Sequence, residues 1–218
     1  MGKVKTKIVV GLHIKKSYQE NGVKNADDII VSNSFISPPL EDEEKILARY
    51  PKVYNEFQQS HSPLITTSAY QIAFIDGIDL YGLDMCIDLM LNLKTDYPNA
   101  GLVLFLANDK MNAEYFKALK NKIKIYGLHD NILFITGQRE LWPVYKNMDL
   151  MIRPTYSDGF GVSVAEAIYF GCPALASDVC ERAVGTHLFR NRDQNDFYNQ
   201  AKTILALRFG PTIDHNDE

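Results

Sequence analysis

Residues 153–185, RPTYSDGFGVSVAEAIYFGCPALASDVCERAVG, constrain the fold of this chain more than any other stretch. The apolar run at 149–153 stops at a proline, as a buried strand does at its carboxyl end. Two glycines in the loop that follows let the backbone approach a ligand closely, and the apolar residues at 162–168 predict a buried helix. The run at 172–177 predicts the next buried strand. The stretch is therefore predicted to form a strand, a glycine loop, a helix and a strand, which is a βαβ unit.

The amino terminus of that predicted helix is suited to binding an anion. Free N–H groups and the positive end of the helix dipole point into the loop, so a phosphate can be held there without a basic side chain. Asp158 lies in the loop, and Glu166 lies about one turn into the helix. A purely structural alternative has Asp158 capping the helix and Glu166 as a solvated carboxylate.

The pattern D-G-F-G-x-S-V-x-E-A-x-x-x-G-x-P-x-x-A-S-D, which begins at Asp158, resembles the E-x7-E donor signature of a known family. These are the retaining glycosyltransferases with the two-domain GT-B fold, of the group 1 or family 4 type. The resemblance implies that the first acid contacts the sugar of a nucleotide-sugar, that Glu166 holds the ribose hydroxyls, and that the glycine loop faces the diphosphate. Asp158 stands where the family usually has Glu, so it keeps the charge and loses one methylene of reach.

The resemblance also implies a set of site residues. Asp158 and Arg182 are the candidate catalytic residues, and no metal site is expected. The candidate nucleotide-sugar-binding residues are Asp158, Gly159, Phe160, Gly161, Val162, Glu166, Gly137, Gln138, Arg139 and Arg153. The family usually supplies an Arg and a Lys to the diphosphate from an earlier loop, where this chain has Gly77 and Tyr81. The diphosphate would then be neutralised by helix amides, by Arg153, Arg139 or Arg182, by a metal, or not at all. Of these we expect Arg182 to replace the missing charge, with Arg153 as the second candidate.

Alternating strand and helix patterns predict the fold. The predicted strands include Tyr70–Ile75, Gly101–Ala107 and Asn131–Ile135, and the predicted helices are Leu83–Leu93, Asn112–Tyr126 and a short one at Glu140–Lys146. Strands that alternate with helices of this length indicate an α/β fold with a doubly wound parallel sheet. The resemblance implies that this sheet is the Rossmann-like half of a GT-B fold. We expect a nucleotide-sugar-binding domain at 62–209 and a frayed tail at 210–218.

The residues before position 62 are mixed and charged. A polar helix is predicted at 13–26, a brief strand at 28–33, and an acidic helix start at Leu40 that Pro51 interrupts. The run Ala26–Ser32 is similar to the last strand of the family's acceptor-side domain. We therefore interpret residues 1–61 as a remnant of that domain with a linker.

Composition narrows the class of protein. The 218 residues are 46% hydrophobic and 23% charged, enough apolar material for one sizeable core. The net charge of −4 gives no broad basic field, so nucleic acid is not expected as a partner. Three cysteines without a C-x-x-C pair indicate reduced thiols in a cytoplasmic protein. Neither a signal peptide nor an integral membrane segment is predicted, while peripheral membrane contact stays open.

Together with the resemblance, these observations favour the donor-binding, carboxyl-terminal half of a GT-B glycosyltransferase. The resemblance implies transfer of a sugar from a nucleotide-sugar to an acceptor hydroxyl with retention, in glycan or polysaccharide biosynthesis, without a cofactor and with a partner acceptor-domain subunit. The competing hypothesis is a catalytically inactive nucleotide-sugar-binding or regulatory module, which the absent Arg and Lys favour. An epimerase of the same fold is a more distant alternative, because its active site also needs both domains.

Overall fold

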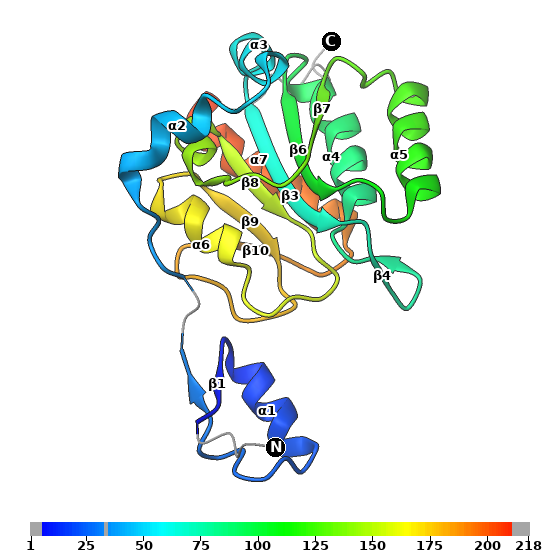
Figure 1. Ribbon diagram of the computed structural model, residues 1–218. Helices are drawn as coiled ribbons and strands as arrows, with labels where there is room; N and C mark the ends of the chain where they lie inside the picture. The colour runs from blue at the N-terminus through cyan, green and yellow to red at the C-terminus, as the bar shows by residue number, and fades with distance from the viewer. Residues whose placement is uncertain (1–5, 33–34, 211–218) are drawn as a thin grey trace.

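The computed structural model of the chain describes residues 6–32 and 35–210. Its main body is a six-stranded sheet in the order β10-β9-β8-β3-β6-β7, and every neighbouring pair is parallel (Figure 1). The strands are β3 (Leu64–Gln71), β6 (Gly101–Asn108), β7 (Ile132–Thr136), β8 (Leu150–Arg153), β9 (Ala174–Ser177) and β10 (His187–Phe189). The chain runs from β3 out to β7 and then crosses back to β8, so the strand order reverses beside β3. The predicted doubly wound parallel sheet is confirmed.

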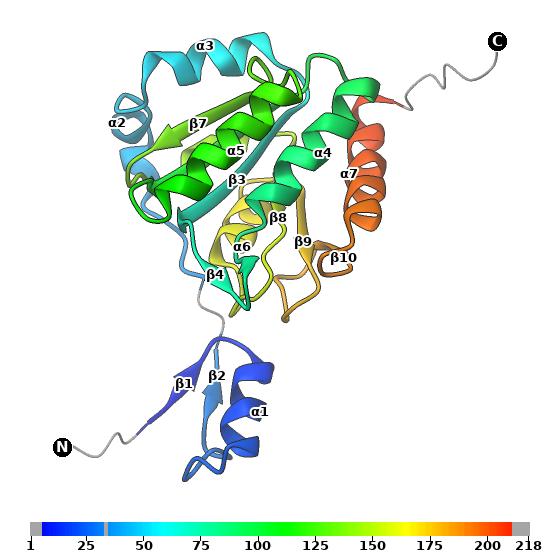
Figure 2. The same ribbon diagram turned by 90° about the vertical axis from the view of Figure 1, so that its right-hand side faces the viewer.

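Helices cover both faces of the sheet (Figures 1 and 2). One face is covered by α4 (Leu83–Asp96), α5 (Ala113–Ile125) and α7 (Gln194–Phe209). The other is covered by α2 (Glu43–Leu47), α3 (Lys52–Ser60), the 3-10 helix η2 (Trp142–Asn147) and α6 (Val162–Tyr169). The sheet is therefore the middle of three layers.

Strand β6 shows why the sequence favours this layering. Leu102 and Leu104 pack in the core beneath α4 and α5, whereas Val103 and Phe105 pack in the core on the opposite face. Successive side chains of a strand point to opposite faces, so a strand buried on both sides needs an unbroken apolar run. The run at 101–107 meets that requirement, and its predicted strand is confirmed.

The predicted strand Tyr70–Ile75 is wrong in its position. The structure places β3 at Leu64–Gln71 and pairs Phe74–Ile75 (β4) with Ile78–Asp79 (β5) in an antiparallel hairpin. Hydroxyl side chains interrupt the apolar pattern of β3, so the sequence does not indicate a buried strand there. Thr66 is nevertheless buried, and its hydroxyl donates to the carbonyl of Val103 at 3.2 Å. The hairpin turns at Asp76–Gly77, where both residues have positive φ.

Two further predictions need correction. The helix predicted at Glu140–Lys146 is the 3-10 helix η2, which has a proline in its first turn. Strand β10 and helix α7 were not predicted, although Asp193 caps α7 by accepting a hydrogen bond from the backbone N–H of Asp196. The predicted helices of α4 and α5 are confirmed with small shifts at their ends.

The amino-terminal residues form a small unit beside the carboxyl edge of the sheet (Figure 1). It contains β1 (Ile8–Val9), α1 (Leu12–Glu20) and β2 (Ile30–Val31), and its two strands pair in parallel. Helix α1 is shorter than the predicted 13–26, and β2 is shorter than the predicted 28–33, whose last residue lies outside the described residues. The 3-10 turn η1 (Leu40–Asp42) leads into α2, and Pro51 separates α2 from α3 as predicted. Of the predicted tail, 211–218 lies outside the described residues.

Candidate functional site

The reversal of strand order brings two loops together at the carboxyl edge of the sheet. The backbone N–H of Tyr156, in the loop after β8, donates to the carbonyl of Leu80, in the loop after β3, at 2.9 Å. A Cβ atom added to Gly82 would lie 2.2 Å from the carbonyl oxygen of Pro154, and Gly82 has a φ of +64°. Glycine is therefore required here for the close approach. Ligands of open α/β sheets bind in the crevice at such a switch point.

A cavity of about 470 Å³ opens between these loops. This first cavity is lined by most of the predicted glycine-loop residues. Residues from β3, from the segment 72–82 between β3 and α4 (the first loop) and from the amino-terminal unit complete the lining. The lining residues are Val10, Ser68, Tyr70, Tyr81, Arg153, Asp158, Gly159, Phe160, Gly161, Val162 and Ser163.

Helix α6 begins at this cavity. Gly161 precedes it with a φ of +78°, and no side chain caps the helix. Its first backbone N–H groups have no partner within the helix, so they are available to a ligand. The alternative in which Asp158 caps α6 is wrong, because Oδ1 of Asp158 accepts from the backbone N–H of Gly159 at 2.9 Å.

Asp158 is held by two arginines. Its Oδ2 accepts from Nε of Arg153 at 2.5 Å and from Nη1 of Arg182 at 2.6 Å. Burial alone would raise the pKa of Asp158, but the two guanidinium groups outweigh it and lower that pKa to about 2. The carboxylate is therefore ionised at every physiological pH. Its predicted contact with a donor sugar would have to compete with two charge-assisted hydrogen bonds.

Arg182 lies beneath the cavity and does not line it. Its side chain is only 2% exposed. Besides Asp158, it donates to the carbonyls of Ser177 and Phe160 and to the hydroxyls of Ser177 and Thr155. All three guanidinium nitrogens are therefore engaged with protein atoms. Contact between Arg182 and a leaving group stays a prediction, and in this conformation the guanidinium is turned to the protein.

Glu166, in contrast to Asp158, has no arginine beside it in the described part of the chain. It lies on α6, and burial raises the pKa of its carboxyl group. Within 6–32 and 35–210, its side chain has no hydrogen bond or ion pair with another residue. Burial raises the pKa of the nearby Tyr145 hydroxyl, and the charge of Glu166 raises it further. A partly buried carboxylate without a donor costs free energy, and a ligand hydroxyl would offset that cost.

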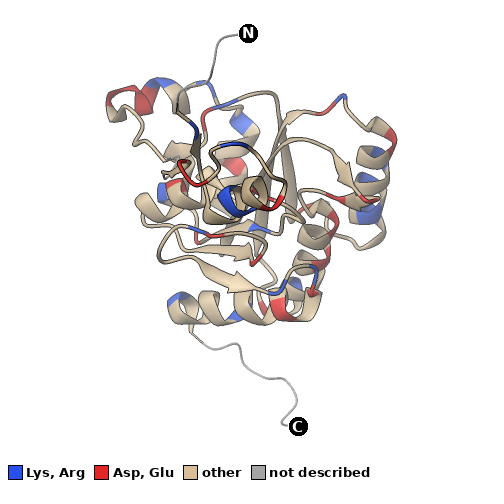
Figure 3. Ribbon diagram, turned by 90° about the horizontal axis from the view of Figure 1, so that it is seen from below, with Lys and Arg blue, Asp and Glu red and all other residues tan. Residues whose placement is uncertain are grey.

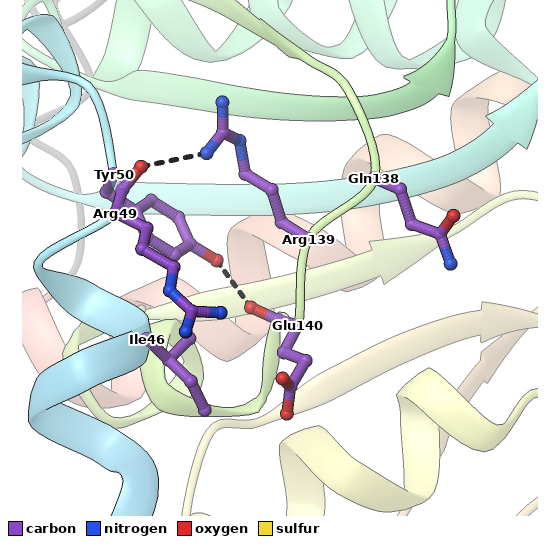
Figure 4. A pocket seen from close by; sticks show the side chains of 6 residues that line it. All are labelled: Ile46, Arg49, Tyr50, Gln138, Arg139 and Glu140. Carbon is purple, nitrogen blue, oxygen red and sulfur yellow. Dashed lines mark hydrogen bonds between the residues drawn. The ribbon is translucent and has the colours of Figure 1, made fainter.

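The remaining predicted residues follow β7. Gln138 and Arg139 line a second cavity of about 290 Å³ with Ile46, Arg49, Tyr50 and Glu140 (Figure 4). Nη1 of Arg139 donates to the carbonyl of Arg49 at 2.9 Å, and the hydroxyl of Tyr50 donates to the carbonyl of Glu140 at 2.7 Å. The predicted residues thus divide between two cavities, except for Gly137, Glu166 and Arg182, which line neither.

Sequence reasoning missed several residues of the first cavity. Ser68 and Tyr70 lie on β3, whose position was predicted wrongly, and Val10 comes from the amino-terminal unit. Ser163 was passed over within the glycine-loop pattern, although its hydroxyl accepts from Nη1 of Arg153 at 3.2 Å. A correct β3 boundary would have placed Ser68 and Tyr70 at the carboxyl edge.

Positively and negatively charged residues among those described are interspersed over the molecule seen from the carboxyl edge, so neither sign forms a broad field there (Figure 3).

The described ranges contain no group of three or more His, Cys, Asp and Glu side chains arranged to hold a metal ion. No helix in these ranges is both long and apolar enough to cross a membrane.

Comparison with known proteins decides the family. The model of the family "Glycosyl transferases group 1" matches residues 60–184, which is more than half of the chain. The chain belongs to this family. The group 1 glycosyltransferase family indicated by the glycine loop is thereby confirmed, and the match includes both loops that form the first cavity.

Two curated relatives match part of the chain. The lipopolysaccharide core biosynthesis mannosyltransferase LpsB of Rhizobium meliloti is 30% identical over 98 residues, which are 45% of this chain and 28% of the relative. The lipopolysaccharide glucosyltransferase WaaG of Escherichia coli is 28% identical over 137 residues, or 58% of this chain and 35% of the relative. The chain thus spans about a third of these relatives' length.

Solved structures show the same fold. A glycosyltransferase from Rickettsia africae matches with a TM-score of 0.73 at 13% identity, over 93% of this chain and 54% of that chain. Anabaena Alr3699/HepE, in complex with UDP and glucose, matches with a TM-score of 0.71 at 15% identity, over 94% of this chain and 54% of that chain. The chain therefore spans about half the length of each of these structures.

Proposed function

We propose that this chain is the donor-binding part of a retaining glycosyltransferase of glycan or polysaccharide biosynthesis. It would hold a nucleotide-sugar while the sugar passes to an acceptor hydroxyl. The observation that carries the proposal is Glu166, a partly buried carboxylate without a partner among the described residues, on the helix whose uncapped start borders the first cavity. The names of the relatives and of the UDP-bound neighbour support it.

The residues suggest how the donor would lie. Backbone N–H groups at the start of α6 would receive the diphosphate, and the carboxylate of Glu166 would accept from the ribose hydroxyls. Gln138 and Arg139 would then lie on the nucleobase side, where they line the second cavity. We propose no cofactor, because these groups only bind and orient a substrate that carries its own leaving group.

Binding of a nucleoside diphosphate tests this proposal. We expect UDP, ADP or GDP at millimolar concentration to raise the melting temperature or release heat in calorimetry. Glu166→Gln should weaken both the nucleoside diphosphate and the corresponding nucleotide-sugar by about 1.5–3 kcal/mol, because a charge-assisted hydrogen bond is lost. Glu114→Gln is the matched control, since Glu114 lies exposed in the first turn of α5. No response to any of these ligands would sink the proposal.

The raised pKa of Glu166 predicts a pH dependence of binding. Ribose hydroxyls donate to the ionised carboxylate, so affinity should be constant above that pKa and fall as the pH drops through it. The fall should begin at a higher pH than for an ordinary glutamate, because the pKa is raised. A nucleotide-sugar is the ligand to titrate from about pH 8 to pH 5, since its diphosphate has no terminal group with a pKa near 6. The profile should flatten in Glu166→Gln, and an unchanged profile would remove Glu166 from the site.

The exposed apolar residues of the amino-terminal unit support the proposal of a partner domain. Ile8 and Ile30, on its two strands, are 64% and 52% exposed, and α1 has no buried residue. A two-stranded sheet with uncovered apolar side chains is marginal by itself. Val10 and Ile14 of this unit nevertheless lie against Gly159. We propose that an acceptor-side α/β domain, on this or another polypeptide, extends the unit and covers the first cavity.

The second candidate function is a nucleotide-sugar-binding module without turnover. Tyr81 favours it, because the resemblance implies a lysine at that position for the diphosphate. Transfer can be separated from mere binding by following the acceptor product, and the anomeric configuration of that product by NMR would test retention.

A further inference from the structure

Arg153 is the basic side chain that lines the first cavity within the part of the chain that the structure describes. It ends β8, and its side chain is 15% exposed. Nε donates to Asp158 and Nη1 donates to the hydroxyl of Ser163. Within the described ranges, Nη2 donates to no protein atom. The guanidinium is therefore fixed from one side while one nitrogen stays available to a ligand.

Tyr81 packs beside this guanidinium. The centre of its ring is 6.0 Å from the guanidinium carbon of Arg153, within the range of a cation–π interaction. The backbone N–H of Tyr81 donates to Oδ1 of Asp79 at 3.0 Å, and Asp79 is buried, so the first loop is held at this place. A lysine at position 81 would bring a second positive charge to the same spot and repel Arg153.

We propose that Arg153 is the diphosphate-binding cation of this chain, and that Tyr81 and Asp158 orient it. The positive charge at this site thus comes from the end of β8, while position 81 of the first loop carries an aromatic ring. Asp158 is then a positioning residue, which acts through Arg153 and does not bind the sugar. This inference rests on the proposed function, because it concerns the same donor site.

The charges around Asp158 support this assignment. Arg153, Arg182 and Asp158 together carry a net charge of +1, and Arg182 is buried with all its nitrogens engaged. The excess positive charge can therefore meet a ligand only through Arg153. Both oxygens of Asp158 already accept hydrogen bonds, one from Gly159 and the other from the two arginines. A diphosphate at the start of α6 would thus find backbone N–H groups and one cation on the same wall of the cavity.

A charge-relocation experiment tests the proposal. UDP is titrated by calorimetry into the wild-type chain, into Arg153→Met, and into the double variant Arg153→Met with Tyr81→Lys; inorganic pyrophosphate serves as a probe without a base. We expect Arg153→Met to weaken both probes at least about 10-fold. The double variant should regain most of that affinity, because the introduced lysine restores a cation to the same cavity. Arg208→Met is the control, since Arg208 pairs with Asp149 at the opposite end of β8 and should leave affinity unchanged.

Asp158→Asn gives a second, independent arm. A positioning role predicts that affinity for UDP and for UDP-glucose changes by the same factor, whereas a sugar contact predicts a loss for UDP-glucose alone. Loss for the sugar-bearing ligand alone, or wild-type affinity in Arg153→Met, would overturn the inference and leave the proposed function standing. A wild-type chain that binds neither UDP nor pyrophosphate would overturn both.

Discussion

Replacing Arg182 by methionine is expected to lower the free energy of unfolding by about 3 kcal/mol. The guanidinium is almost fully buried and joins Asp158 to Ser177 and Thr155. Methionine fills a similar space and donates no hydrogen bond, so the buried carboxylate and two hydroxyls lose their shared donor. Arg182→Lys should recover little of the loss, because a single ammonium group cannot reproduce the forked geometry.

Urea unfolding monitored by circular dichroism measures this effect. Arg208→Met is again the matched control, because Arg208 also pairs with an aspartate but is 60% exposed, and its loss should cost less than about 1 kcal/mol. The double variant Arg182→Met with Asp158→Asn should be less destabilised than the two single losses added together, since the two residues contact each other. Additive losses would show that the pair is not coupled.

The same cluster predicts a stability change in acid. The pKa of Asp158 is lowered to about 2 in the folded chain, below its ordinary value of 3.8. The stabilisation is therefore complete above the unfolded pKa and disappears as the pH falls through the interval from about 4 to about 2. Asp158→Asn should remove this part of the acid dependence, and an identical acid profile in wild type and variant would contradict the assignment.

The sequence predicted the fold where local pattern and packing agree. Strand β6 was recognised because its own residues form an unbroken apolar run that is buried on both faces. The loop before α6 was recognised because its own glycines determine its conformation. Strand β3 was misplaced because its centre holds Thr66, whose hydroxyl is satisfied only by β6, a partner distant in the chain. Short edge elements such as β10 have a weak periodic signal, so tertiary packing decides them.

The glycine-loop residues of the site were predictable from the sequence, whereas its β3 residues and its side-chain contacts were not. A family pattern indicates which residues gather at the carboxyl edge, and the structure brings Asp158, Gly161 and Arg153 to one cavity. It does not indicate which charges pair, because Arg182 reaches Asp158 across 24 residues of chain. The sequence therefore suggested Arg182 as a free cation, whereas the structure leaves Arg153 as the arginine that faces the cavity.

A preparation of residues 1–218 alone is expected to bind donor and to transfer no sugar. The leaving diphosphate gains negative charge as the glycosidic bond breaks, and only interactions stronger in that transition state than in the ground state accelerate the step. Here Arg153 shares its charge with Asp158, and Val10 is the only described residue of the amino-terminal unit that lines the first cavity. Water is then not excluded from the anomeric carbon, which costs further stabilisation.

Release of nucleoside diphosphate, measured with and without candidate acceptors, checks this expectation. The rate should lie at least roughly 10³-fold below that of a preparation completed by an acceptor-side domain, the order of effect expected when preorganised electrostatic stabilisation is lost. Calorimetric binding of donor by the same sample is the control that the chain is folded and competent. In a preparation completed by such a domain, Arg182→Met would act through stability and positioning, whereas Arg153→Met would lower turnover even under conditions in which the variant is fully folded. Robust transfer by residues 1–218 alone would show that the second domain is dispensable, because the chain would then carry its own acceptor site.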